Sequence, residues 1–176
     1  MKRSNKMKHT PGPNSPPAAP SISYEPTTHE RAAVERYRAR RDEKPPLPGF
    51  KVQYQGDTAT ISPHHADPVY VHALLANMVA TGDSTFSGGL LDQIANVARS
   101  GKHLTARELN FALATVHAIG PRDPTEALLA AQMAAIHQAT MVATRRLNHT
   151  ETIDQQDSCS GMLNRLARTF AAQVEA

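Results

Sequence analysis

The densest group of potential metal ligands lies in the segment SPHHADPVYVH, which holds His64, His65, Asp67 and His72. Two histidines and a carboxylate can bind zinc. Here, however, two of the histidines are adjacent and the third falls in the helix that follows, so the spacing matches no established zinc pattern. Asp67 is better placed as the N-cap of that helix, whose first residue is a proline. We therefore expect no metal ion and no cofactor.

A second candidate is His137, which stands one helical turn from Met133 and from Met141 in a long apolar segment. A metal site would need further ligands, and none stands four residues away on the same helix. A general base would need a carboxylate or a nucleophile aimed at it. A hydrogen-bonded histidine in the core or at a subunit interface explains the same residue, and we prefer this interpretation.

The remaining candidates for chemistry are weaker. The segment TGDSTFSGGLLDQ precedes a helix but lacks the lysine and the final Ser/Thr of a phosphate-binding P-loop. Cys159 is the only cysteine, so no intrachain disulfide can form, which fits a reducing, cytoplasmic compartment. The sequence shows no pattern of paired carboxylates, a catalytic triad or a cofactor-binding loop. We therefore expect that the protein is not an enzyme.

Positive charge is concentrated near the N-terminus. Residues 1–48 hold ten Lys or Arg and five Asp or Glu, a net charge of +5, whereas residues 49–176 hold nine and eleven, a net charge of −2. Arginines can clamp the phosphates of nucleic acid. The candidates are Arg31, Arg36, Arg38, Arg40 and Arg41. Acidic residues interleave them, so a solvated charged helix explains the same pattern, and weak nucleic-acid binding through the arm is kept as an alternative.

The N-terminal arm predicts little stable structure. Residues 1–26 are rich in proline and poor in large apolar side chains, which is typical of disorder. Residues 27–44 have helical spacing and a threonine cap, but only two large apolar side chains, so this helix is marginal. We therefore divide the chain into a disordered basic arm, residues 1–48, and a helical domain, residues 49–176.

The period of the apolar residues changes in the segment FKVQYQGDTATIS, residues 50–62. Apolar and polar residues alternate on either side of Gln55-Gly56-Asp57, which predicts a β-hairpin. Two short strands are not stable alone. The hairpin must therefore lie on the helices that follow, or pair with another chain.

From residue 67 onward the sequence predicts a series of helices with clear start and stop signals. N-caps are expected at Asp67, at Asp83 or Ser84, at Thr105 with Glu108, and at Asp123. The connections are short, which favours antiparallel neighbours. The sequence thus predicts a mainly α fold: a helical bundle of about five helices with a small N-terminal β-hairpin and a disordered basic arm. No run of 18 apolar residues exists, and we expect no contact with a membrane.

The longest helix is expected from Pro124 to Leu147. Alternating steps of four and three residues place a seam on one side of it, a pattern that is typical of helix–helix contact. Beside this seam, small residues would let another helix approach closely. We expect the helix to be buried and central in the bundle. The proposed interface residues are Leu129, Met133, Ile136, His137, Thr140 and Leu147.

The C-terminal two thirds of the chain resembles a group of small helical proteins of alphaproteobacteria, often encoded near prophage or other mobile-element genes. The residues that carry the resemblance are GPRDPTEALLAAQMAAIHQATM, residues 120–141, and LNRLARTFAAQVEA, residues 163–176. Members typically continue with a longer polar tail, so the last helix is expected to be cut short or to fray. The group has no assigned activity, so the resemblance implies only a bacterial cytoplasmic setting.

Two hypotheses follow from the sequence. The first is a non-enzymatic interaction or assembly protein, whose helices bind a protein partner or form a homo-oligomer. The alternative is a DNA-associated accessory protein of a prophage or mobile element, which uses its basic N-terminal arm to contact phosphates.

Overall fold

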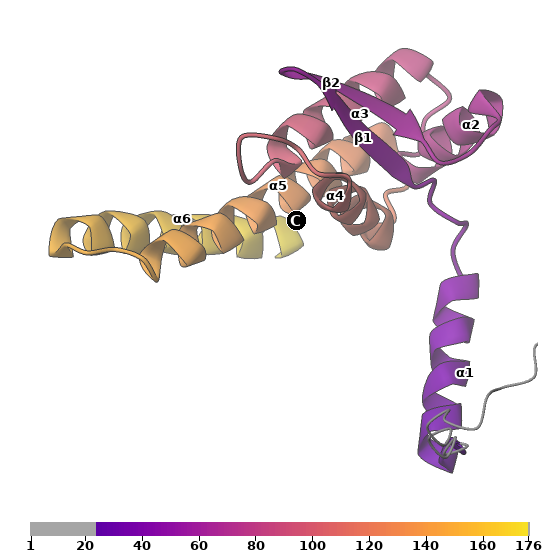
Figure 1. Ribbon diagram of the computed structural model, residues 1–176, viewed down its shortest axis with the longest axis horizontal. Coiled ribbons are helices and arrows are strands. Elements are labelled where there is room, and N and C mark those ends of the chain that lie inside the picture. The colour runs from indigo at the N-terminus through magenta and orange to yellow at the C-terminus, as the bar shows by residue number, and fades with distance from the viewer. Residues whose placement is uncertain (1–23, 176) are drawn as a thin grey trace, which may run out of the picture. The chain divides into compact units, whose positions relative to one another are not determined.

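The computed structural model describes residues 24–175, which form six helices and one two-stranded antiparallel hairpin (Figure 1). The elements are α1 (Thr28–Asp42), β1 (Phe50–Gln55), β2 (Thr58–Pro63), α2 (Pro68–Met78), α3 (Ser84–Ala98), α4 (Ala106–Ile119), α5 (Pro124–Leu147) and α6 (Ile153–Glu175). The predicted mainly helical fold with a small hairpin is therefore confirmed. Most of the segment predicted to be disordered lies outside the described residues.

The chain divides into two compact units between Lys44 and Pro45, four residues before the boundary expected from the sequence. The described part of the first unit contains α1, which begins with a capping box. The N–H of Glu30 donates to Thr27 Oγ1 at 3.3 Å, and the N–H of Thr27 donates to Glu30 Oε2 at 2.7 Å. No residue of α1 is buried, so the cap and the local helical pairs alone support it.

The core of the second unit is formed by α2, α3, α4 and the first half of α5. Its largest fully buried side chains come from the end of α2, from α3 and from α4. They are Val79, Ile94, Leu109, Leu113 and Val116. Burying each of them contributes roughly 1.5–3 kcal/mol of hydrophobic free energy, so this cluster holds the unit together.

The β-hairpin is attached by polar contacts to α4 and to the loop that precedes α4. The amide of Asn110 clamps Phe50, since its Oδ1 accepts from the backbone N–H and its Nδ2 donates to the carbonyl, both at 2.8 Å. Tyr54 Oη accepts from the N–H of Leu104 at 2.6 Å. The turn has Gly56 at φ 62°, a left-handed conformation that favours glycine. The hairpin thus lies on the helices, the first of the two arrangements expected.

The helix caps follow the sequence expectation. Side-chain oxygens accept from backbone N–H groups at the starts of α2, α3, α4 and α5, and α4 ends on a left-handed glycine. These capping residues are Asp67, Asp83, Thr105, Asp123 and Gly120. Each cap satisfies backbone groups that the helix itself leaves unpaired.

Glu108 ties the α3–α4 connection together. Its Oε1 accepts from the N–H of Ser100 at 3.1 Å and from the Ser100 hydroxyl, while its Oε2 accepts from the N–H of Thr105 at 2.8 Å. Partial burial raises the pKa of Glu108, but the hydrogen bonds from Ser100 and Thr105 outweigh it and lower the pKa from 4.5 to about 2. The folded state therefore prefers the ionised carboxylate.

This shift predicts acid sensitivity of the connection. Because the pKa of Glu108 is depressed on folding, its contribution to stability is present above pH 4.5 and is lost as the pH falls towards about 2. We expect Glu108→Gln to lower the free energy of unfolding by about 1–2 kcal/mol at pH 7. Urea unfolding at a series of pH values measures this difference, which should shrink between pH 4.5 and pH 2.

The matched control is Glu151→Gln, at an exposed glutamate before α6. It should leave stability within about 0.5 kcal/mol of the original protein at neutral pH. A difference between the Glu108 variant and the original protein that stays constant across the acidic range would contradict the assignment.

Candidate interaction surface

The two ends of α5 have different surroundings. In its first half, Ala127, Ala130 and Ala134 are buried where α5 packs on α3 and α4. Beyond Ala134, the only buried residue of α5 is Ala143. The small side chains allow close approach in the first half. The second half extends away from the core and has α6 beside it (Figure 1).

The prediction that the whole of α5 is a buried rod is therefore wrong. Of the seam residues, Leu129, Met133, Ile136, Thr140 and Leu147 are only half-buried, whereas the small side chain of Ala143 is buried. Around the circumference of α5, the seam lies between Gln132 and His137. The side chains of Gln132 and His137 both contact α6. The seam thus faces α6, but a single neighbouring helix does not enclose it.

The facing side of α6 repeats the same spacing. Its half-buried residues Cys159, Leu163, Leu166, Phe170 and Gln173 follow steps of four, three, four and three. No residue of α6 is buried, although α6 packs along α5. The two helices therefore form an antiparallel hairpin, which we call the α5–α6 hairpin, with both seams half-covered.

Two contacts set the register of the α5–α6 hairpin. Gln173 Nε2 donates to Gln132 Oε1 at 3.4 Å. The rings of His137 and Phe170 have their centroids 6.4 Å apart. As the residue number rises on α5 it falls on α6, so the end of α6 returns to the core (Figure 1).

His137 is a packing residue in this arrangement. Its ring lies between Phe170 of α6 and Phe111 of α4, whose centroid is 6.2 Å away. Three helices therefore meet at one aromatic cluster. Among the described residues, no group of three or more His, Cys, Asp or Glu side chains is arranged to hold a metal ion. The geometry supports the structural interpretation of this histidine.

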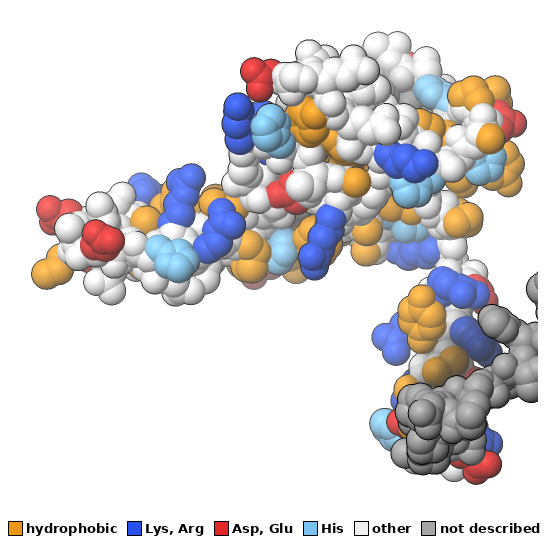
Figure 2. All heavy atoms as spheres, viewed as in Figure 1, with side chains coloured by type: hydrophobic (Ala, Val, Ile, Leu, Met, Phe, Trp, Pro, Cys, Tyr) orange, Lys and Arg blue, Asp and Glu red, His pale blue; other side chains and the backbone are white. Residues whose placement is uncertain are grey.

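Large apolar side chains are exposed on α4, α5 and α6. Phe111 is 52 % exposed, Met141 50 % and Val174 62 %. Figure 2 shows hydrophobic side chains on the surface along the hairpin, among basic ones. Because these side chains lie outside the core of the second unit, they are available for contact with another surface.

A shallow groove of about 130 Å³ lies between α3 and α5. Its apolar walls are formed by Leu90, Ile94, Val97, Leu128 and Ala131. One end of α3 is fixed to α5, because Gln138 Nε2 donates to the carbonyl of Ala98 at 3.2 Å. This groove extends the exposed apolar surface along the other side of α5.

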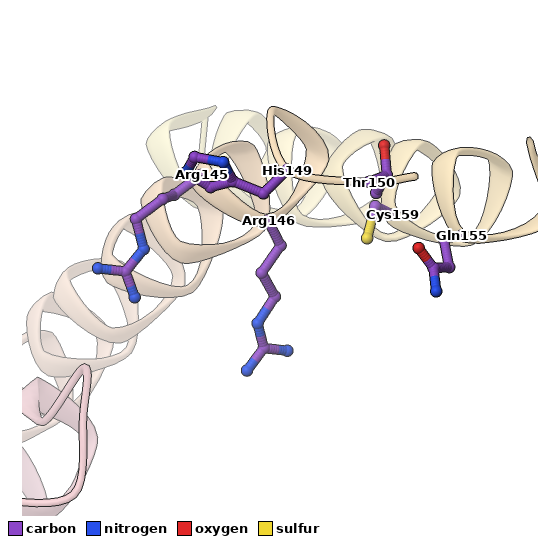
Figure 3. Close-up of a pocket in the computed structure, with 6 residues that line it drawn as sticks. All are labelled: Arg145, Arg146, His149, Thr150, Gln155 and Cys159. Carbon is purple, nitrogen blue, oxygen red and sulfur yellow. The ribbon is translucent and has the colours of Figure 1, made fainter. Parts of the chain in front are cut away.

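A second depression, of about 310 Å³, lies at the tip of the α5–α6 hairpin (Figure 3). It is lined by Arg145, Arg146, His149, Thr150, Gln155 and Cys159. The guanidinium groups of the two arginines point away from one another and from the cysteine. The depression therefore gathers positive charge without converging on one anion.

The histidine-rich segment has a structural explanation. His65 Nδ1 accepts from the N–H of Asp67 at 3.0 Å, and its ring stacks on Tyr70 with centroids 5.3 Å apart. Asp67 accepts from the N–H of Val69 at 2.9 Å as the N-cap of α2. His64 and His72 are exposed. The segment thus shapes the start of α2.

The five arginines of α1 are all exposed. Three of them use a guanidinium N–H locally. Arg31 donates to the carbonyl of Pro26, Arg40 to the carbonyl of Arg36, and Arg41 to Asp42 Oδ1 at 3.0 Å. At helical spacing, Arg31 and Arg38 lie opposite Arg36 and Arg40, so α1 presents no single basic stripe.

Three contributors to the surface were missed at the sequence level: Phe111, Phe170 and Gln173. The spacing in the sequence puts Phe170 on one apolar face with Leu163 and Leu166, but it does not place Phe170 opposite His137. The steps of four and three residues from Cys159 to Gln173 were the available signal, since they match the spacing of the seam on α5. Phe111 gave no such signal, because its neighbours in α4 belong to the core.

No protein-family model matches the chain, and neither a curated protein nor a solved structure matches it. The resemblance to the alphaproteobacterial proteins therefore stays a prediction. None of the described helices combines the length and the apolar character that crossing a membrane requires.

The aromatic cluster predicts the effect of removing one ring. We expect Phe170→Ala to destabilise the docking of α6 on α5 by about 2 kcal/mol, less than for a fully buried phenylalanine because this side chain is half-buried. Hydrogen exchange of the α6 amides measures the loss, which should be concentrated in α6. The control is Val174→Ala on the same helix, at a side chain that is 62 % exposed. Equal effects of the two substitutions would contradict the cluster.

Proposed function

We propose that this protein is a non-enzymatic helical interaction and assembly protein that binds through the α5–α6 hairpin. The observation that carries the proposal is that α6 packs along α5 without burying one of its own residues. An amphipathic helix of 23 residues gains its stability mainly from covering its apolar face. A partner that covers the flanks of this hairpin would supply the missing burial.

The exposed apolar residues support the same role. Phe111 and Met141 lie on helices next to the half-buried seam, and each leaves about half of its surface open to water. At about 25 cal/mol for each Å² of apolar area, covering such side chains contributes several kcal/mol to binding. The partner is a second copy of the chain or another protein, and no membrane contact is needed. The single cysteine, Cys159, supports a reducing, cytoplasmic setting.

An alternative function is favoured by the exposure of the arginines on α1. A DNA-associated accessory protein of a prophage or mobile element would use Arg31, Arg36, Arg38, Arg40 and Arg41, together with the basic residues before them, to neutralise phosphates. The dispersal of these arginines around the helix favours weak binding that does not depend on nucleotide sequence.

Removal of residues 1–44, which leaves the second unit whole, separates the two functions. We expect the shortened protein to keep the oligomeric mass of the full chain in light scattering, because the second unit is compact by itself. In the same experiment, fluorescence anisotropy with duplex DNA at several salt concentrations measures phosphate contact, which the alternative requires and the deletion would abolish.

The control is the full chain at low and high salt. A full chain that stays monomeric would refute self-assembly through the α5–α6 hairpin, and one that does not bind nucleic acid at low salt would refute the alternative function. An oligomer that is lost on deletion would refute the role of the α5–α6 hairpin.

A further inference from the structure

The face of α6 that points away from α5 has an ordered pattern of charge. Asp157 and Arg165 lie four residues on either side of Gly161, while Asp154 and Arg168 lie seven residues on either side of it. At 100° for each residue, all four side chains fall within about 40° of the direction of Gly161 on the helix surface. The seam that faces α5 lies on the opposite side. We call this charged stripe the outer face of α6.

The outer face has no ion-pair partner among the described residues. The ion pairs of the described chain join Arg41 to Asp42, Lys102 to Asp57, and Arg122 to Glu126. The acidic and basic halves of α6 are separated along the helix, so they are too far apart to pair at the i,i+4 spacing that stabilises single helices. All four charged side chains are exposed.

Gly161 is not explained by the chain itself. It lies in the interior of a helix, where glycine is about 1 kcal/mol less favourable than alanine. A Cβ added at this position would meet no atom within 4 Å, so packing does not require glycine either. Glycine at such a site is accounted for when another backbone approaches it closely.

We infer that α6 pairs with α6 of a second copy of this chain, antiparallel and with a two-fold axis at Gly161. In this pairing Asp157 of each copy lies level with Arg165 of the other, and Asp154 with Arg168. Ser158 and Asn164, three residues on either side of the axis, are also matched as hydrogen-bonding groups. The contact is isologous, as a two-fold dimer requires.

Charge also selects the direction of pairing. A parallel alignment in the same register would place aspartate against aspartate and arginine against arginine, which is destabilising. The antiparallel alignment forms each ion pair twice. Without a side chain at Gly161 the two backbones approach closely, so the side chains four residues away can reach across. The inference rests on the proposed assembly function and assigns a second copy of the chain to the outer face of α6, which is distinct from the apolar flanks of the hairpin.

The decisive experiment uses two charge-reversed variants of the full chain. Asp154→Arg with Asp157→Arg makes the outer face wholly basic, and Arg165→Asp with Arg168→Asp makes it wholly acidic. Each variant alone should dimerise on the order of tenfold more weakly, or not at all, in sedimentation equilibrium. An equimolar mixture should form a one-to-one heterodimer, which weakens as salt is added. Arg145→Asp with Arg146→Asp, on α5, is the control of equal charge change and should dimerise as the original protein does.

A second variant separates pairing from folding. Gly161→Leu should keep or raise the thermal stability of the isolated chain, since leucine is the better helix former and open space receives it. The same variant should lose the dimer, because the added side chain separates the two backbones.

The outcomes distinguish this inference from the function on which it rests. A dimer that persists in all charge and glycine variants overturns the pairing through α6, while assembly through another face of the α5–α6 hairpin stands. An original protein that is monomeric, with a mixture of variants that also stays monomeric, overturns both the pairing and self-assembly of the chain.

Discussion

The structure depends on one geometric constraint: two helices packed only on each other enclose a small side chain such as Ala143 but leave larger side chains between them partly exposed. The first half of α5 lies against α3 and α4 as well, and there Ala127 and Ala130 are fully buried. The second half has α6 as its neighbour, and its seam is left half-covered. A third and a fourth helix are needed to close such a layer, as in helical bundles. The proposed functions of the hairpin follow from this difference between the two halves.

The choice of alanine in the first half of α5 and of larger residues further along has a physical reason. Where α5 crosses the core, Ala127, Ala130 and Ala134 permit a close approach to α3 and α4. The large side chains Leu129, Met133 and Ile136 lie on the seam instead and are only half-buried. At the core, α5 therefore contributes only small side chains. Its larger residues lie at the contact with α6, which covers them only in part.

The sequence predicted the local structure well, because local structure depends on neighbouring residues. The capping box of Thr105 with Glu108, the N-caps Asp67 and Asp123, and the alternation of residues 50–62 each act within a few positions along the chain. It did not predict how deeply α5 is buried. The apolar spacing of the seam is the same whether one helix or three helices cover it, since periodicity reports a face and not its neighbours.

The candidate surface was less accessible to prediction because it is assembled from distant parts of the chain. The contact of Phe111 with His137, and that of His137 with Phe170, join residues of three helices, and the sequence alone does not decide which rings meet. By contrast, the seam residues could be identified from spacing alone, since alternating steps of four and three residues mark one side of a helix.

The polar pair at the inner end of the hairpin shows how its register is fixed. Gln173 Oε1 is buried and has no hydrogen-bond partner among the described residues, whereas its Nε2 donates to Gln132. Leaving a buried acceptor unpaired costs roughly 1–3 kcal/mol. A slip of one heptad that sets Gln173 level with Ala139 instead of Gln132 would break this hydrogen bond and leave the Nε2 of Gln173 without its partner. Like single polar residues in other helical seams, the pair therefore lowers stability but favours one alignment of α6 on α5. A defined alignment is what a helix needs if its outer face is to present its charges in a fixed order to another surface.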